Sequence, residues 1–344
     1  MTRYTADFTP KKLLFKQPAG TSRGVYTERN LFLLTIRDEE KGIYGVGEIA
    51  PLPNLSCDDV PELENVILDS CKHFNGVIDY DALRNYPSVL FGFESAWNLL
   101  CHGGSSSNTF FESLFSRGEC GIDINGLIWM GTFEEMKSRI EEKLKAGFHC
   151  IKLKIGAINF DEELELLKKI RREYSADEIT LRVDANGGFR PDEAMEKLNR
   201  LSELDIHSIE QPIRAGQWEA MARLCKDSPI PIALDEELIG INTPTGKQEL
   251  LNTVRPAYII LKPTLHGSFY GCNEWIELAK ERNIGYWATS ALESNVGLTA
   301  IAQWASTLNV SIPQGLGTGA LFQKNIDLFP IQIVGEKLWF NKCP

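Results

Sequence analysis

The sequence predicts an α/β protein in which a modified, TIM-like (β/α)7β barrel carries a smaller α+β domain at its N-terminus. The chain has 344 residues, enough for a barrel of about 250 residues and a smaller second domain. From about residue 120 onward, short apolar runs alternate with helical stretches, which is typical of parallel strands joined by right-handed crossovers. About eight such runs favour a closed barrel over an open sheet, and the helices are one too few for the standard barrel.

The N-terminal α+β domain is predicted to cover residues 1–119. A strand pair is expected at 31–36 and 42–48, joined by a charged turn. Helical patterns follow at 62–71 and 88–100, and a Gly/Ser-rich break at 103–107 separates this domain from the next. The barrel is predicted to cover 120–322.

The expected barrel strands are short and apolar. They cover 122–129, 150–155, 180–183, 206–209, 230–234, 258–261 and 285–288, with a last segment around 315–319. Helices between them include 161–174 and 191–204. No G-x-G-x-x-G motif follows the first strand, which excludes the dinucleotide-binding doubly wound fold.

The composition of the chain limits which kinds of partner and which cellular compartment we expect. The formal net charge of -11 argues against a nucleic-acid partner, because phosphate binding needs a basic surface. The eight cysteines contain no C-x-x-C pair, so we expect free thiols in a reducing compartment. No run approaches 18 apolar residues and no signal peptide is recognisable, so we expect a cytoplasmic protein without a membrane partner.

The strongest functional pattern is a charged residue at the end of each of five successive predicted strands. In the run 151–155, period-two alternation puts Lys152 and Lys154 on one face and three aliphatic side chains on the other. The aliphatic face is expected to pack against helices, so both ammonium groups point into the barrel near its C-terminal mouth. The same parity directs further residues inward: Arg182, Asp184, Glu210, Asp235 and Lys262.

Three of these residues are predicted metal ligands. Asp184, Glu210 and Asp235 follow one another at intervals close to one β-plus-α unit, so they are expected to meet at one rim. Converging carboxylates raise one another's pKa unless a cation neutralises them. An all-oxygen set selects Mg²⁺, with Mn²⁺ as a substitute, over zinc. The alternative is that each carboxylate serves a separate helix cap or salt bridge.

Lys154 and Lys262 are predicted to face each other across this metal. A lysine base must lose its proton near neutral pH, so its pKa of ~10.4 has to fall by ~3 units. Neighbouring cations and desolvation both act in that direction. Lys152 is either a structural partner of a rim carboxylate or a substrate contact.

Several local strings resemble the o-succinylbenzoate synthase family, in the muconate-lactonizing subgroup of the enolase superfamily. The Lys-x-Lys, Asp, Glu, Asp, Lys order on successive strands is similar to the superfamily pattern. The strings that resemble the family itself are at 45–53, 182–186, 209–212, 234–236, 261–263 and 290–297.

The resemblance implies a lyase acting on a small-molecule carboxylate. The substrate would be 2-succinyl-6-hydroxy-2,4-cyclohexadiene-1-carboxylate, dehydrated on one face to o-succinylbenzoate for menaquinone biosynthesis. Lys154 would remove the proton α to the metal-bound carboxylate and then assist departure of the hydroxyl. Lys262 would stabilise the resulting anion as a cation.

The resemblance also implies substrate contacts. Arg182 and Asn186 would hold polar groups of the substrate, or else form hydrogen bonds inside the barrel. Ser290 would contact the succinyl tail, and Gly315 and Leu316 would offer backbone N–H groups. The N-terminal α+β domain would be a capping domain, whose loops around Arg23 and residues 51–52 close over the mouth, and residues 323–344 would return to it.

One departure separates this chain from dipeptide epimerases. Those relatives carry two acids on the last barrel strand to hold an ammonium group, whereas this chain has Gly315, Gly317 and Gly319 there. The open alternatives are an N-succinylamino acid racemase or another cycloisomerase or epimerase at the same site, and a non-catalytic metal-binding barrel. The sequence does not predict the oligomeric state.

Overall fold

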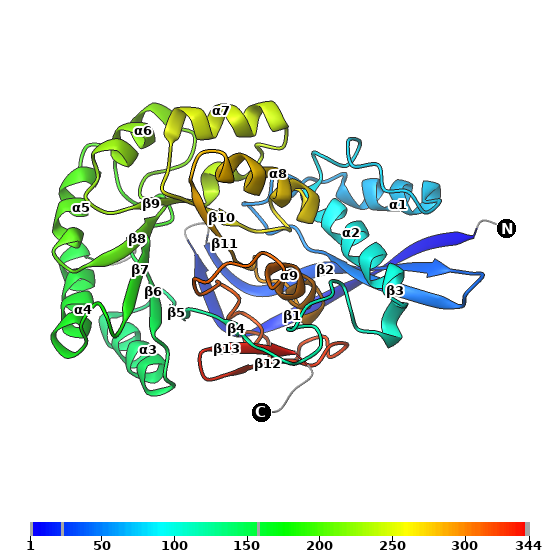
Figure 1. The fold of residues 1–344 in the computed structure, drawn as a ribbon, viewed down its shortest axis with the longest axis horizontal. Helices are drawn as coiled ribbons and strands as arrows, with labels where there is room; N and C mark the ends of the chain where they lie inside the picture. Colours follow the sequence, from blue (N-terminus) through cyan, green and yellow to red (C-terminus); the bar gives the residue numbers. More distant parts are fainter. Residues whose placement is uncertain (1–2, 22–23, 157–158, 341–344) are drawn as a thin grey trace.

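The cap is built on an antiparallel sheet, and Figure 1 shows it beside the barrel. The computed structural model describes residues 3–21, 24–156 and 159–340. The cap strands have the order β1-β2-β3. Their bounds, and those of the helices packed on them, are β1 (Tyr4–Thr21), β2 (Gly24–Asp38), β3 (Ile43–Ile49), α1 (Leu63–His73), α2 (Pro87–Cys101) and the short 3-10 helix η1 (Gly104–Ser106).

Two glycines allow β3 to pack closely on α2. A Cβ on Gly45 would collide with the backbone oxygen of Ala96, and one on Gly47 with that of Gly92. The close approach buries Ile49 of β3 against the helix side of the cap core. Glycine is therefore required here for space rather than for an unusual backbone angle.

The barrel is a parallel sheet of seven strands within the described residues, in the order β11-β10-β9-β8-β7-β6-β5. The strand bounds are β5 (Gly126–Ile128), β6 (Cys150–Lys154), β7 (Thr180–Asp184), β8 (Ile206–Glu210), β9 (Ile232–Leu234), β10 (Tyr258–Leu261) and β11 (Gly285–Ala288). The helices between and after them are α3 (Phe133–Lys145), α4 (Phe160–Glu173), α5 (Ala194–Ser202), α6 (Trp218–Asp227), η2 (Glu236–Leu238), α7 (Pro244–Val254), α8 (Ser268–Lys280) and α9 (Asn295–Ala305).

Two single-residue bridges close the ring. Gln314 pairs with Ile124 and Gly315 with Thr289, so this short segment serves as an eighth strand between β11 and β5. Gly315 N donates to Ala288 O at 2.8 Å, and Asn125 N donates to Gln314 O at 3.0 Å. The predicted barrel with a reduced last unit is confirmed.

The barrel core follows the alternation read from the sequence. Ile151, Leu153 and Ile155 of the β6 region are fully buried in the main apolar cluster. The intervening helices present apolar stripes to this layer, as α4 does with Leu164, Leu167 and other residues. Lys152 and Lys154 are thereby directed to the barrel interior.

The expected strand at 122–129 is two strands in two different sheets. β4 (Ile122–Asp123) pairs with β13 (Lys337–Phe340), which pairs with β12 (Ile331–Val334). The chain then crosses at Ile124, whose N–H donates to Glu336 O at 2.9 Å, before β5 joins the barrel. One apolar run thus contributes a strand to each of the two sheets, because its first part pairs with β13 and its last part with β6.

Other elements also differ from the sequence-based expectation. The long strand β1 was not predicted, and α5 begins at Ala194 because residues 190–193 form a turn. The C-terminal segment reaches the cap only in part. Gln323 N donates to Leu14 O at 2.8 Å in β1, whereas the β12-β13 hairpin pairs with β4.

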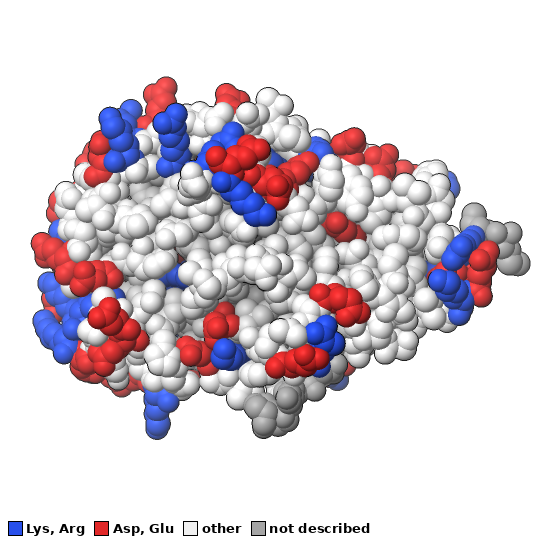
Figure 2. All heavy atoms as spheres, in the orientation of Figure 1, with Lys and Arg blue, Asp and Glu red and all other residues white. Residues whose placement is uncertain are grey.

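In the part of the chain that the structure describes, the seven cysteines are free thiols: Cys57, Cys71, Cys101, Cys120, Cys150, Cys225 and Cys272. No helix among these residues is long and apolar enough to cross a bilayer. Figure 2 shows Lys and Arg side chains interspersed with Asp and Glu around the periphery of one face.

Replacing Gly47 by alanine is expected to destabilise the protein by about 1–3 kcal/mol or more, because the new methyl group meets backbone that cannot rotate away. Denaturant-induced unfolding measures the loss. Gly246→Ala in α7 is the matched control, since its nearest atoms belong to side chains, and we expect a change within about 1 kcal/mol. Equal losses in both variants would contradict the packing argument.

Candidate active site

The charged residues gather at the C-terminal ends of the barrel strands. Strand register aligns Lys154 with Asp184 and Asp184 with Glu210, while Asp235 and Lys262 directly follow β9 and β10. In the closed ring of eight positions, β6 and β10 lie four positions apart in either direction. Lys154 and Lys262 therefore stand on opposite sides of the barrel mouth, with the carboxylates on the strands between them.

Ion pairs join the lysines to the carboxylates. Lys152 Nζ lies 3.0 Å from Asp184 Oδ2 and 2.6 Å from Glu210 Oε2. Lys154 Nζ lies 3.0 Å from the same Asp184 oxygen, and Lys262 pairs with Asp235. All six side chains are largely buried. The network compensates charges that water cannot reach.

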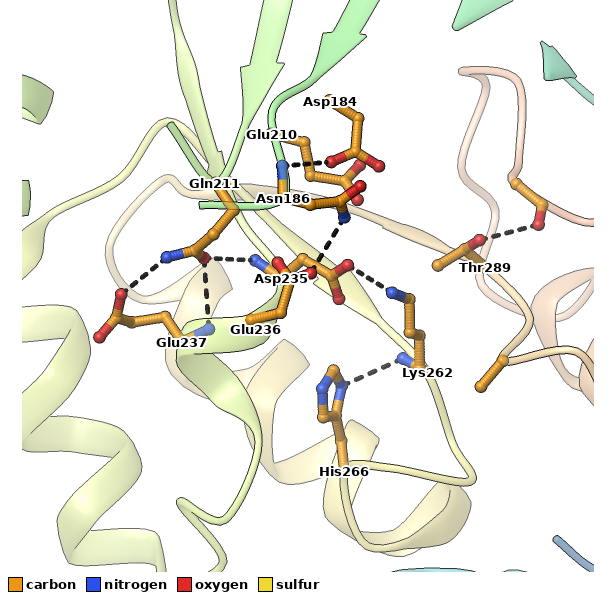
Figure 3. Close-up of polar contacts among 12 residues, drawn as sticks. Asp184, Asn186, Glu210, Gln211, Asp235, Glu236, Glu237, Lys262, His266 and Thr289 are labelled. Atoms are coloured by element: carbon orange, nitrogen blue, oxygen red, sulfur yellow. Dashed lines mark hydrogen bonds and ion pairs between the residues drawn. The ribbon is translucent and has the colours of Figure 1, made fainter. Parts of the chain in front are cut away.

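Glu236 extends this network and was missed in the sequence. Lys154 Nζ donates to Asn186 Oδ1 at 2.7 Å. Asn186 Nδ2 in turn donates to Glu236 Oε1 at 3.0 Å (Figure 3). Asp184 Oδ1 accepts from Asn186 N at 3.0 Å, so Asn186 is held at both its backbone and its side chain. Adjacent acids at 235–237 were the available signal, but parity alone does not say which of them faces the mouth.

Gln211 fixes the turn that carries Asp235 and Glu236. Its Oε1 accepts from the backbone N–H groups of Asp235 and Glu237, each at 3.2 Å, and its Nε2 donates to Glu237 Oε2 at 2.9 Å (Figure 3). Asn186 and Gln211 both adopt positive φ, 43° and 42°. Such angles are rare for residues with side chains, and they cluster at functional sites.

The pKa values within the cluster follow from burial and from these pairs. Burial disfavours the charged form of Lys152, but the carboxylates of Asp184 and Glu210 outweigh it and raise its pKa. Burial acts likewise on Lys262, and Asp235 and Glu210 raise its pKa above the ordinary value. Both side chains therefore hold their proton.

The carboxylates divide into two groups by the direction in which their pKa values are shifted. Burial raises the pKa of Asp184, but Lys152 and Lys154 outweigh that effect and hold the pKa below its usual range. Burial, reinforced by Asp184, raises the pKa of Glu210 well above its ordinary value. Burial also raises the pKa of Asp235 and of Glu236. Among these four acids, ionisation is therefore least favourable at Glu210, Asp235 and Glu236.

Their free oxygens fit a hard cation. Among the described residues, Glu210 Oε1, Asp235 Oδ1 and Glu236 Oε2 are buried without a hydrogen-bond partner. Four carboxylates here face three ammonium groups, so one negative charge is uncompensated when all are ionised. An all-oxygen set with this surplus suits Mg²⁺ or Mn²⁺.

A common ion would require a small rearrangement. In this conformation no three acidic, histidine or cysteine side chains of the described chain are grouped closely enough to hold one ion. The Lys152 ammonium lies within 3.0 Å of both Asp184 and Glu210, and Lys262 is paired with Asp235. These two lysine heads would have to shift before the carboxylates could share a cation.

A cavity of about 830 Å³, including its open mouth, lies above the cluster. On one side it is lined by charged residues, among them Lys154, Asp184 and Glu236. The other side is uncharged, and its lining includes Leu52, Leu55, Asn125, Leu127, Trp129, Trp287, Thr289, Ser290, Ala291, Leu292, Gly315, Gly317 and Thr318. The cavity therefore has a polar half that suits an anion and a neutral half that suits an uncharged ring or chain.

The predicted substrate contacts fall into two groups. Lys152, Asn186, Ser290 and Gly315 line the cavity. Ser290 Oγ lies 2.5 Å from Thr318 Oγ1 on the neutral side, and Thr318 was not anticipated. Arg23 lies outside the described residues.

The cavity lining in the described chain does not include Arg182 or Leu316. Arg182 is buried lower in the barrel, where Nη1 donates to Pro313 O at 2.9 Å and the guanidinium lies 4.4 Å from the Trp287 ring. Leu316 is fully buried in the apolar core. Period-two alternation correctly predicted that Arg182 points into the barrel. It does not predict how far below the mouth of the barrel a side chain lies.

Comparison with known proteins identifies the family. Residues 135–340 match the model "Enolase C-terminal domain-like", and residues 21–100 match "MenC, N-terminal domain". The chain is 44% identical over 347 aligned positions to an o-succinylbenzoate synthase from Desulfotalea psychrophila, covering 91% of this chain and 93% of the relative. It is 24% identical to an L-Ala-D/L-Glu epimerase from Bacillus subtilis, covering 83% of this chain and 79% of the relative.

A solved structure agrees with the sequence match. The crystal structure of MenC from Desulfotalea psychrophila superposes with a TM-score of 0.84 at 37% identity, covering 98% of this chain and 99% of that chain. The similarity extends over the cap as well as the barrel.

Removing Lys152 is expected to destabilise the fold strongly. Lys152→Met leaves Asp184 and Glu210 buried without the ammonium between them, at a cost of about 3–5 kcal/mol. Denaturation without divalent ions measures this. Lys168→Met is the control, because its pair with Glu165 on α4 is exposed, and it should change stability by less than about 1 kcal/mol. Similar losses of unfolding free energy in both variants would show that the buried carboxylates do not need the Lys152 ammonium to compensate their charge.

Proposed function

The chain belongs to the o-succinylbenzoate synthase family of the enolase superfamily, and on that premise we propose that it is a Mg²⁺-dependent lyase that dehydrates 2-succinyl-6-hydroxy-2,4-cyclohexadiene-1-carboxylate to o-succinylbenzoate. The product would feed menaquinone biosynthesis in the cytoplasm. The partner is thus a small carboxylate, in keeping with a cavity that is charged on one half and neutral on the other.

The observation that carries this proposal is the pair of lysines on opposite sides of one cavity. Lys154 on β6 and Lys262 after β10 both line it, and the acids Asp184 and Glu210 line it from the strands between them. A planar substrate lying between the lysines would present one face to each. One lysine can then move a proton while the other stabilises charge.

Asp184, Glu210 and Asp235 are proposed to hold the metal ion. Their neighbour Glu236 lines the cavity with a free buried oxygen, so it belongs to the same negative region. When bound, Mg²⁺ would supply Lewis-acid stabilisation of negative charge developing on the substrate carboxylate, worth several kcal/mol.

Lys154 is the proposed base. Its Nζ is oriented by Asp184 Oδ2 and Asn186 Oδ1, and in its neutral form it would take the proton from the ring carbon that bears the carboxylate. The electron pair of that C–H bond then forms the new ring double bond as the hydroxyl leaves the neighbouring carbon. The protonated Lys154 returns its proton to that hydroxyl on the same face, so water departs and the ring becomes aromatic.

Lys262 is proposed to remain an ammonium throughout. Burial lowers its pKa, but the charges of Asp235 and Glu210 outweigh this effect and favour the charged form. From the opposite side of the mouth it would stabilise the anionic intermediate, partly over the ring face. The succinyl tail would extend to the neutral half, where the hydroxyls of Ser290 and Thr318 offer hydrogen bonds.

The same geometry supports a second candidate activity, racemisation of N-succinylamino acids. Two lysines on opposite sides of a carbon acid can remove a proton from one face and return it to the other. A dipeptide epimerase is less suitable, because Gly315 and Gly317 bring no carboxylate to the cavity for an ammonium group.

Lys154→Ala is expected to lower turnover about 10²–10⁴-fold, because the proton-transferring group is lost. Appearance of the aromatic product in the ultraviolet measures the rate. Lys168→Ala, on the exposed face of α4, should behave as wild type. Turnover retained in Lys154→Ala would remove this residue from the mechanism. Wild-type racemisation of N-succinylamino acids without aromatic product would replace the dehydratase proposal by the second candidate.

Titration calorimetry with Mg²⁺ tests the metal site separately from activity. Glu210→Gln is expected to weaken binding at least about tenfold, since a charged oxygen ligand is lost. Glu163→Gln is the matched control, because this buried acid serves the backbone of Gly156 instead. EDTA should abolish the turnover of the wild type. Unchanged Mg²⁺ affinity in Glu210→Gln would place the ion elsewhere.

A further inference from the structure

Arg29 is a buried cation at the junction of cap and barrel. It lies on β2, its side chain is 1% exposed, and it ranks among the largest fully buried side chains in the described chain. Burial lowers its pKa, and the charges of Glu293 and Glu48 oppose that effect. A guanidinium is costly to bury, so its hydrogen bonds have to be nearly complete.

Those hydrogen bonds go to backbone carbonyls of two separate loops. On the cap side, Nη1 donates to Pro51 O and Nη2 to Ala50 O. On the barrel side, Nε donates to Leu292 O at 3.1 Å, and Nη2 also approaches Ala291 O at 3.4 Å. The planar fork of one side chain thus ties the loop after β3 to the loop after β11.

The two loops form part of the neutral half of the cavity. Leu52 and Leu55 come from the cap loop, and Ser290, Ala291 and Leu292 come from the barrel loop. Leu52 and Leu292 also belong to one apolar cluster together with Ala50 and Leu31. Their separation therefore sets the width of the cavity where the proposed tail of the substrate would lie.

Glu48 of β3 fastens the same barrel segment from a second point. It accepts from the backbone N–H groups of Ser294 and Gly297, each at 2.9 Å, and from the Ser294 hydroxyl at 2.5 Å. These groups belong to the first turn of α9 and its N-cap. The cap sheet therefore holds residues 291–297 through two neighbouring strands.

We propose that Arg29 is a positioning residue, which holds the cap loop 50–55 and the barrel loop 290–292 at the spacing that the distal part of the substrate requires. This role rests on the proposed function only for the identity of the ligand. Arg29 does not touch the reacting atoms, so it should affect substrate affinity more than the chemical step.

Arg84 provides a matched control within the same chain. It is also a cap arginine that bonds to the barrel, with Nη1 donating to Asn242 O at 2.9 Å and to Glu274 at 3.0 Å. Neither of these partners lines the catalytic cavity. A general loosening of the cap would therefore appear in Arg84 variants, whereas a loss of loop spacing would appear only in Arg29 variants.

The test compares Arg29→Lys with Arg84→Lys. Lysine keeps the charge but cannot bond both loops with a planar fork. In steady-state dehydration of the substrate, we expect Arg29→Lys to raise KM about tenfold with kcat within about threefold, and Arg84→Lys to change neither. Wild-type KM in Arg29→Lys, or an equal rise in Arg84→Lys, would overturn the proposal.

Hydrogen exchange without any ligand separates this proposal from the proposed function. In Arg29→Lys, amides of both 50–56 and 290–297 should exchange about tenfold faster than in the wild type, and in Arg84→Lys neither segment should change. Unchanged exchange in Arg29→Lys would reject the proposed positioning role of Arg29, whichever reaction the enzyme catalyses.

If Arg29→Lys does not fold, the wild type decides the question. Added o-succinylbenzoate should then protect both segments together, and protection of the barrel loop alone would count against a coupled pair of loops.

Discussion

Compensation of buried like charges is the constraint from which the rest of the site follows. Asp184, Glu210, Asp235 and Glu236 would repel one another in a water-poor barrel mouth, so the lysines must lie among them. The parallel barrel makes this possible, because every strand ends at the same rim and contributes one or two side chains. The ammonium groups balance most of the negative charge, and the remaining surplus favours a divalent cation.

The cavity is lined by residues of both the barrel and the cap. The strand ends supply the charged half of the cavity, and barrel residues such as Trp287 and Ser290 supply most of the neutral half. Leu52 and Leu55 bring apolar side chains from the cap, and the glycines that let β3 pack on α2 hold the sheet that carries this loop. Arg29 and Glu48 then attach the sheet to the barrel at residues 291–297. The charged half of the cavity thus comes from the barrel alone, whereas the neutral half combines residues of the barrel and the cap.

Much of the fold could be predicted from the sequence, because a barrel repeats one local pattern. Aliphatic alternation in 151–155 placed Lys152 and Lys154 on the inner face, and regular spacing brought Asp184, Glu210 and Lys262 to the same rim. The pattern failed where one segment serves two neighbours, as at 122–128. It also failed for β1, whose exposed and buried residues follow no strict alternation. Strand parity predicts whether a side chain points inward but not how deep in the barrel it lies. It therefore could not show that Arg182 lies below the cavity and not in its lining.

The sequence by itself determined the barrel class and the inward direction of the rim charges, since these depend on local periodicity and on residue type. Its local strings also carried the resemblance to the family. Only the tertiary structure decided which carboxylate oxygens are left without partners, how Asn186 and Glu236 connect to Lys154, and that Arg29 joins two loops more than two hundred residues apart. The reason is physical. Such contacts depend on the distance between atoms of segments that are remote in the chain, and ring closure and domain packing set those distances.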